Sequence, residues 1–487
     1  MNLGIFHLPC SEESVRNAPQ MTGIGHWHKQ APPSAKMVGM SCPPWLTPNT
    51  DAFAPSVWPA TAARVDGQLQ IGGVSLVAAA EQWGTPLYLL DEADFIARAT
   101  AFRDAFAPWQ VHYGSKAFLT RTVARWAFEA GLGIDVCSSG ELTATLQAGV
   151  EAGVIAVHGN NKSDAELADA VEAGVGRIVV DSFNEIDRLA ELVSTRPADA
   201  APVPVLLRVT PGVSADTHVS IQTAVADQKF GFSMIGGVAL EGLRRLEAVP
   251  GIDLRGVHCH VGSQILSTQS HEVAIVRLVA LLALFRSAVG RELPECSLGG
   301  GFGIAYTTAD KPLAPSVIAN RLMAALDQAR VVQDLGPLTV SIEPGRAIVG
   351  PAGVALYTVG TVKPVAGLRT YVSVDGGMSD NPRPAVYQAS YMALLANRVS
   401  KAPPMLCRVV GKHCETGDIL VRHTYLPKDI HPGDLIAVPA SGAYQRSMAS
   451  NYNYALRPPV VALRDGAGTV LLRRETIEDL MALDVGW

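Results

Sequence analysis

The strongest candidate for a reactive side chain is a lysine in an otherwise apolar stretch, VHYGSKAF (111–118). An ammonium in apolar surroundings is unfavourable unless it is paired, and desolvation lowers its pKa. A lowered pKa is what a lysine needs to attack a carbonyl group and form an imine. We therefore predict that Lys116 is a nucleophile. The alternative is a lysine that ends a strand and reaches solvent.

A glycine-rich run, GGGFG (299–303), is the second candidate feature. Residues without side chains let backbone N–H groups approach a phosphate closely. The spacing differs from that of a dinucleotide-binding fingerprint, and no third glycine opens a helix. The run indicates a phosphate site, although a tight turn would explain the same glycines.

Two further strings carry ionisable groups close together. HCHVGS (258–263) holds His258 and His260 two residues apart, which places both on one face of a strand. No third ligand with zinc-type spacing accompanies them, so we predict no metal site. EPGR (343–346) sets Glu343 three residues before Arg346. That pair suits a binding site or an ion pair beside a turn.

The C-terminal part of the chain offers three more strings. CETGD (414–418) holds a thiol, Cys414, beside a carboxylate in a glycine turn. GAY (442–444) places Tyr444 at the start of a polar stretch, and RPAVY supplies Arg383 and Tyr387 four residues apart. Since a free cysteine is most often a small apolar residue, spacing alone assigns these side chains no chemistry.

Short apolar, β-branched runs recur from residue 110 onward, with helix-like segments between them. The runs lie at 111–118, 133–138, 154–159, 177–182, 203–211, 254–262, 296–302 and 338–345. Alternating strands and helices require parallel pairing with right-handed crossovers. Eight such units predict a (β/α)8 barrel of the TIM type. A doubly wound open sheet is the alternative fold.

The polar residues named above fall where such a barrel places its active site, at the C-terminal ends of the strands. Lys116, His158, His260, Gly300 and Glu343 each end or follow one of the strand candidates. They are therefore expected to converge on one mouth of the barrel. Three predicted helices begin with a capping box: Ser138 with Glu141, Ser163 with Glu166, and Ser182 with Glu185.

Residues 348–487 have a different texture, with short β-rich segments separated by glycine and proline turns. We predict a β-sandwich or β-barrel-like domain there, joined by strands from 58–88, where LQIGGVSL (69–76) has the same character. The barrel is predicted at 89–347. Residues 1–57 carry Pro-Pro pairs without apolar periodicity and are predicted to be a disordered tail.

Composition excludes several other classes of protein. The chain has 487 residues, enough for two domains, with 48% hydrophobic and 17% charged residues. A net charge of −6 without basic clusters argues against nucleic-acid binding. No apolar run is long enough to span a membrane. The seven scattered cysteines show no CxxC spacing, which favours a reducing, cytoplasmic location.

Taken together, ordered strings along the chain resemble the fold-type III pyridoxal-phosphate-dependent decarboxylases, and among them the diaminopimelate decarboxylase family. The resemblance covers residue 58 to the C-terminus and includes GTPLYLLDE, YGSKAF, GLGIDVCSSGEL, HGNNKS, DQKFGF, HCHVGSQI, GGGFG, EPGR, VDGGMSDNPRPAVY, CETGD and SGAYQRSMASNYN. It implies a barrel plus a β domain, pyridoxal 5'-phosphate as cofactor, and a homodimer with shared active sites.

The resemblance also implies roles for individual residues toward the cofactor. Lys116 would bond covalently to the cofactor aldehyde, His260 would stack on the ring, and Glu343 would pair with the pyridine nitrogen. The remaining residues would contact the phosphate or lie beside it: Ser263, Gly300, Gly301, Gly345, Arg346 and Tyr444.

For the substrate, the resemblance implies decarboxylation of meso-2,6-diaminopimelate at its D-centre, which yields L-lysine and CO2. Arg346, Arg383, Tyr387 and Tyr444 would contact the substrate. Cys414 would deliver a proton from the neighbouring subunit. Its neighbour Glu415 would hold the distal ammonium.

Other functions remain open at this point. Decarboxylases of ornithine, arginine or a carrier-linked glutamyl group share many of these strings. A catalytically inactive relative would usually lack Lys116 or Cys414, and both are present. A racemase on a similar barrel is disfavoured by the strings CETGD and EPGR.

Overall fold

The structure of the chain is a computed structural model, and it describes residue 46 and residues 53–213 and 228–486. The predicted tail, 1–57, lies almost entirely outside the described residues. Where the description begins, Val57 and Trp58 are already buried. Within the described residues, no helix combines the length and the apolarity needed to cross a membrane. A cytoplasmic location stays a prediction.

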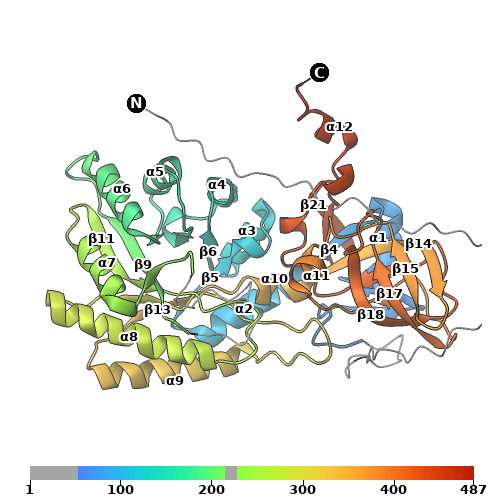
Figure 1. Cartoon of the computed structure of the whole chain (residues 1–487), viewed down its shortest axis with the longest axis horizontal. Helices are drawn as coiled ribbons and strands as arrows, with labels where there is room; N and C mark the ends of the chain where they lie inside the picture. The colour runs from blue at the N-terminus through green and yellow to red at the C-terminus, as the bar shows by residue number, and fades with distance from the viewer. Residues whose placement is uncertain (1–45, 47–52, 214–227, 487) are drawn as a thin grey trace, which may run out of the picture. The chain divides into compact units, whose positions relative to one another are not determined.

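Eight parallel strands form a closed ring, which confirms the predicted barrel (Figure 1). They are β5 (Gln110–Gly114), β6 (Gly133–Val136), β7 (Ile155–Val157), β8 (Arg177–Val180), β9 (Val203–Thr210), β11 (Ile252–His258), β12 (Glu295–Ser297) and β13 (Thr339–Ile342). Pairing of β13 with β5 and of β8 with β9 closes the ring. A two-residue strand, β10 (Phe232–Ser233), pairs beside β9. Each of the eight strand candidates therefore overlaps one barrel strand, although β5, β11 and β12 begin one or two residues before the predicted runs.

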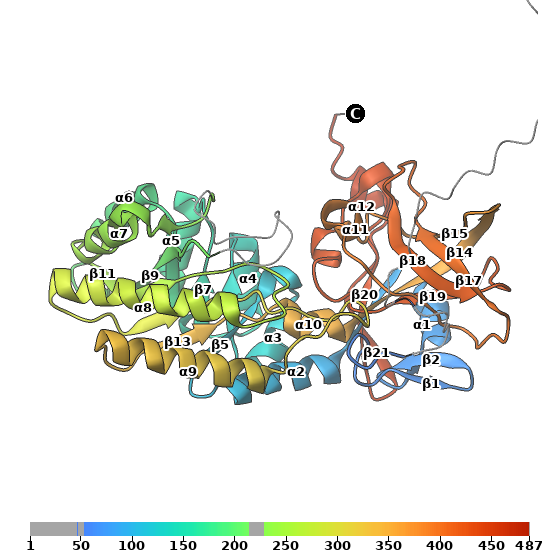
Figure 2. The ribbon, with the colours of Figure 1, turned by 60° about the horizontal axis from the view of Figure 1, so that its bottom comes forward.

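Helices precede the first of these strands, connect each strand to the next, and cover the outside of the ring. They are α2 (Glu92–Phe106), α3 (Arg121–Glu129), α4 (Ser139–Gln147), α5 (Asp164–Ala173), α6 (Phe183–Ser194), α7 (Val238–Glu247), α8 (Gln269–Val289) and α9 (Pro315–Gln333). Figure 2 shows the two longest, α8 and α9, running side by side. Each barrel strand packs against helices on its outer face and against other side chains in the barrel interior. Such strands are apolar on both faces, as Ile178, Val179 and Val180 of β8 illustrate.

The three predicted helix starts are confirmed, but only one of the three predicted capping boxes forms completely. Ser138, Ser163 and Ser182 all cap their helices with a side-chain oxygen. The reciprocal half of the capping box forms only at Ser163. In the other two helices the glutamate carboxylate accepts from the residue before the serine, the N–H of Cys137 or of Asp181. Those two serines therefore act as ordinary N-caps.

A second, mixed sheet follows the barrel, as predicted. Its path runs β18–β17–β15–β14–β4–β20–β21, and β19 pairs with β14 and with β16. The strands are β4 (Leu87–Asp91), β14 (Gly353–Val365), β15 (Arg369–Val374), β16 (Leu394–Leu395), β17 (Pro404–Val410), β18 (Ile419–Pro427), β19 (Leu435–Val438), β20 (Val460–Arg464) and β21 (Ala467–Leu472). Strand β4 precedes the barrel in sequence but lies between β14 and β20.

The stretch 69–76 does not enter this sheet. It contributes to a small sheet made of β1 (Ala63–Val65), β2 (Gln68–Ile71) and β3 (Val74–Ser75), and α1 (Leu76–Trp83) follows. Short helices complete the described chain: α10 (Arg346–Ala352), which links β13 to β14, α11 (Arg383–Tyr387) and α12 (Ile477–Met481). The exact domain boundaries stay predictions.

Candidate active site

A cavity of about 340 Å³ opens at the C-terminal ends of the barrel strands. Most of the residues predicted for the site line it: Lys116, His260, Ser263, Gly301, Glu343, Gly345, Arg346, Arg383, Tyr387 and Tyr444. Gly300 lies next to this set without lining the cavity. Side chains that the sequence did not single out also contribute, namely Lys229, Phe230, Phe302 and Met448.

Lys116 lies in a single helical turn, Ser115–Ala117, directly after β5, and its side chain opens into the cavity. The turn is tied to the C-terminal part of the chain, because the N–H of Tyr444 and the hydroxyl of Ser447 both donate to the Ala117 carbonyl. The predicted lowering of the Lys116 pKa is wrong. Burial does lower it, but Tyr444, Asp135 and Glu343 outweigh burial and raise the pKa of Lys116 above its ordinary value.

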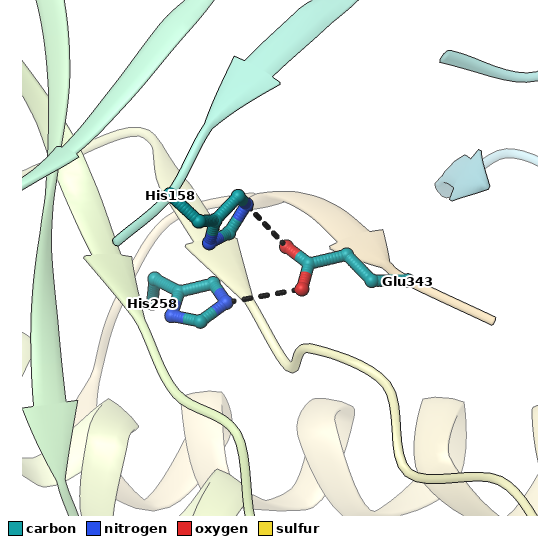
Figure 3. Close-up of side chains that lie close together, drawn as sticks. All are labelled: His158, His258 and Glu343. Carbon is teal, nitrogen blue, oxygen red and sulfur yellow. Dashed lines mark hydrogen bonds and ion pairs between the residues drawn. The ribbon is translucent and has the colours of Figure 1, made fainter. Parts of the chain in front are cut away.

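Glu343, directly after β13, is buried among hydrogen-bond donors (Figure 3). His258 Nε2 lies 3.2 Å from Glu343 Oε2, and Ser297 donates to Oε1 at 3.1 Å. Burial raises the pKa of Glu343, yet the nearby imidazoles of His258 and His158 outweigh burial and hold it well below its usual range. Glu343 is therefore an ionised carboxylate at the floor of the cavity.

His158 and Asp135, from β7 and β6, complete the surroundings of this carboxylate. His158 Nε2 lies 3.4 Å from Asp135 Oδ1 and 3.4 Å from Glu343 Oε1. Burial, then Glu343, raise the pKa of Asp135 well above its usual range. Burial lowers the pKa of His158 well below its usual range, only partly offset by Glu343. Negative charge in this cluster is thus concentrated on Glu343.

The set His158, His258 and Glu343 could also hold a metal ion by ligand type, since its donor atoms lie within 4.8 Å of one another. The sequence predicted no metal for HCHVGS, and this stays a prediction for the set. Its carboxylate is already bonded by His258 and Ser297.

The glycine run forms a cradle in which only glycine fits. A Cβ on Gly300 would lie 2.2 Å from the Glu343 carbonyl oxygen, and one on Gly301 would lie 2.3 Å from the Gly262 carbonyl oxygen. Gly301 also has φ +98°, a conformation that side chains rarely allow. The Gly300 N–H donates to His260 Nδ1 at 3.2 Å, which fixes the ring at the edge of the cradle.

His260 itself is half-buried and faces the cavity. Burial, then the charge of Lys116, lower the pKa of His260 well below its usual range. The ring is therefore neutral near pH 7. A neutral, flat imidazole beside a glycine cradle suits contact with an aromatic ring.

Two buried guanidiniums line the same cavity. Arg346 is 7% exposed and donates to Ser263 Oγ at 2.7 Å and to Tyr306 Oη. Arg383 is 5% exposed and donates to Tyr391 Oη at 2.5 Å. Among the residues that the structure describes, neither forms an ion pair with a carboxylate. Because buried cations need compensation, each indicates a place for a bound anion.

Cys414 and Glu415 do not line this cavity, and both are exposed. Their loop is held by Asp418, which accepts from the N–H groups of Met378 at 2.6 Å and His413 at 2.8 Å. A single described chain therefore does not bring the thiol to the cavity. Their roles, like the other residue roles given by the resemblance, stay predictions.

Sequence reasoning missed two tyrosines that contact the arginines of the cavity, Tyr306 and Tyr391. Tyr306 follows the quoted run GGGFG by three residues, so an extension of that string would have included it. Tyr391 follows α11 in an unremarkable stretch, and its contact with Arg383 is visible only in three dimensions.

These residues fit pyridoxal phosphate. A cradle that excludes any Cβ, with Arg346 and Ser263 beside it, suits a phosphate, and an ionised buried carboxylate suits a protonated pyridine nitrogen. A lysine at the end of the first barrel strand can reach an aldehyde placed between them. Fold and site together define a pyridoxal-phosphate-dependent enzyme built on a TIM-type barrel.

Comparison with known proteins agrees with this class and narrows it. Residues 92–350 match the family described as pyridoxal-dependent decarboxylase, pyridoxal binding domain. Diaminopimelate decarboxylase from Mycobacterium tuberculosis is 47% identical, with 89% of this chain and 98% of that protein covered. The enzyme of the same name from Bacillus subtilis is 43% identical, with 86% and 95% covered.

A solved structure is similar as well. Diaminopimelate decarboxylase from M. jannaschii in co-complex with L-lysine superposes with a TM-score of 0.81 at 28% identity, covering 88% of this chain and 98% of that one. The chain belongs to the diaminopimelate decarboxylase family of pyridoxal-dependent decarboxylases. It is accordingly a carboxy-lyase that uses pyridoxal phosphate.

Proposed function

We propose that this enzyme decarboxylates meso-2,6-diaminopimelate at its D-centre to give L-lysine and CO2. One observation carries the choice of substrate: besides the cation beside the phosphate cradle, the cavity holds a second buried guanidinium, Arg383, without a protein carboxylate in the described residues. Diaminopimelate has a second carboxylate for such a cation to bind, whereas ornithine lacks one.

Different residues of the cavity would have different roles in the reaction. Pyridoxal phosphate, when bound, supplies the conjugated ring that accepts the electron pair released as CO2 leaves. Lys116 would hold the cofactor covalently through its side-chain amine. Glu343 would keep a proton on the pyridine nitrogen, since its own pKa is held low and it stays ionised. His260 would support the ring face.

The phosphate would lie against Gly300 and Gly301, with Ser263 and Arg346 contributing a hydroxyl and a charge. Tyr444 packs under Arg346, with its ring centroid 4.5 Å from the guanidinium carbon, and would contact phosphate or substrate. Gly345 lets the segment after β13 pack closely against the segment after β5, because a Cβ on it would lie 2.5 Å from the Gly114 carbonyl oxygen.

At the far end of the substrate, Arg383 and Tyr387 would bind the second carboxylate. We propose that Cys414 and Glu415 act in the cavity of a second copy of the chain within a homodimer. Their exposure and their absence from their own chain's cavity support this arrangement. Cys414 would deliver the proton to Cα, and Glu415 would bind the distal ammonium.

The test is a panel assay with the cofactor-loaded enzyme. Release of CO2 from meso-diaminopimelate with formation of L-lysine is the expected result. The panel includes ornithine, arginine and a carrier-linked glutamyl group. Turnover of one of these without turnover of diaminopimelate would overturn the proposed substrate while leaving the decarboxylase class intact.

A further inference from the structure

Two tyrosines with no assigned role, Tyr306 and Tyr391, lie between and beside the two guanidiniums of the cavity. Tyr306 follows β12 in the barrel, and Tyr391 lies between α11 and β16 in the C-terminal part of the chain. Both are buried, at 6% and 1% exposure. Their rings meet edge to face, with centroids 5.1 Å apart.

Each tyrosine makes a different kind of contact with the arginines. Tyr306 accepts a hydrogen bond from Arg346 through its hydroxyl, while its ring face lies 4.6 Å from the Arg383 guanidinium carbon. Tyr391 accepts a hydrogen bond from Arg383 Nη1 at 2.5 Å. Tyr306 therefore contacts both arginines, whereas the hydroxyl of Tyr391 is hydrogen-bonded to Arg383.

These contacts orient Arg383 without neutralising it. The aromatic face and the phenolic oxygen offset part of the desolvation of a buried cation. A carboxylate in the same place would have neutralised Arg383 and competed with a ligand. Arg383 Nε is buried and has no hydrogen-bond partner among the described residues. An oriented guanidinium that no carboxylate of the described residues neutralises can bind an anion that enters the cavity.

We infer that Tyr306 and Tyr391 are specificity-determining positioning residues, which hold Arg383 so that the cavity selects an amino acid bearing a second carboxylate. This inference rests on the proposed function and names two further residues on which the choice of substrate would depend. The ring of Tyr306 and the hydroxyl of Tyr391 would position Arg383, which would bind the distal carboxylate. The hydroxyl of Tyr306 would position Arg346, which lies on the phosphate side of the cavity.

The test compares two ligands that differ by one carboxylate. L-Lysine retains the distal carboxylate of diaminopimelate, and cadaverine lacks it. Inhibition constants of both are measured against meso-diaminopimelate turnover, with the cofactor-loaded enzyme. The ratio of the two constants reports the carboxylate contact, whereas a general loss of folding or of cofactor would move both constants together.

Tyr391→Phe removes the hydroxyl that Arg383 uses. We expect L-lysine binding to weaken about tenfold, as for loss of a hydrogen bond to a charged group, with cadaverine binding changed less than about twofold. Tyr306→Leu removes the ring face and should lower the same ratio. Tyr306→Phe is its matched control: it keeps the ring, and should leave the ratio unchanged while weakening cofactor binding.

Equal effects on L-lysine and cadaverine in Tyr391→Phe and Tyr306→Leu would overturn the inference, as would no effect on either ligand. The wild-type enzyme in the same assay separates this failure from a failure of the proposed function. If wild type turns over meso-diaminopimelate but the variants keep their ligand preference, only the tyrosine assignment fails. If wild type does not turn it over, the proposed substrate fails first.

Discussion

His258 Nε2 lies 3.2 Å from Glu343 Oε2, and the two residues come from the ends of strands on opposite sides of β12 in the ring (Figure 3). This contact joins the string HCHVGS, which supplies His258, to the string EPGR, which supplies Glu343. It explains how a fully buried glutamate remains ionised. The pyridine nitrogen of the cofactor would then face a fixed negative charge.

Replacement of His258 should therefore act through Glu343. His258→Leu removes the donor and leaves the carboxylate less well supported, so kcat for diaminopimelate should fall about tenfold or more. His258→Gln can still donate and should retain more activity. Steady-state kinetics with cofactor content checked by absorbance measures both. Equal activity of the two variants would contradict a hydrogen-bonding role.

Lys116→Ala should abolish the covalent attachment of the cofactor. We expect kcat to fall on the order of 1,000-fold, which corresponds to about 4 kcal/mol in the barrier. Borohydride reduction followed by peptide mapping should label Lys116 in the wild-type protein and give no label at that position in the variant. A pyridoxyl label on a different lysine of the wild type would show that the site is misassigned.

Shared active sites can be tested by mixing two inactive variants. Lys116→Ala and Cys414→Ala each disable a different half of the proposed composite site. After dissociation and random reassociation of equal amounts, mixed dimers should regain one intact site, which gives about a quarter of wild-type activity. If each cavity used the thiol of its own chain, mixing would restore nothing.

The titration of Asp380 should make the stability of the folded protein depend on pH. Burial raises the pKa of Asp380 to about 7, only partly offset by hydrogen bonding from the Gly377 N–H and by Lys412. The unfolded chain ionises this group near pH 4, so the wild-type protein loses stability as pH rises from about 4 to about 7 and no further above that.

Asp380→Asn removes this titration. The melting temperature of the variant minus that of wild type should increase between pH 4 and pH 7, by about 3 °C or more, and then level off. Thermal unfolding followed by circular dichroism at several pH values measures the difference. A difference that is the same at every pH would mean that Asp380 does not titrate in this range.

Much of the architecture could be predicted because it depends on local patterns. Apolar, β-branched runs alternate with amphipathic segments, and that alternation permits few folds other than a parallel barrel. Once the barrel is assumed, strand ends converge on one mouth, which is why Lys116, His260 and Glu343 could be grouped without coordinates. Serines at helix starts were equally local features, and all three cap their helices.

Local patterns thus predicted eight barrel strands, a second β domain and a group of residues most of which line one cavity. The fold decided which strand joins which sheet, as with β4 between β14 and β20, because that choice depends on partners hundreds of residues away. It also decided the charge states. The pKa of Lys116 rises because Tyr444, Asp135 and Glu343 surround it, and such sums of long-range electrostatic interactions cannot be read from neighbours in sequence.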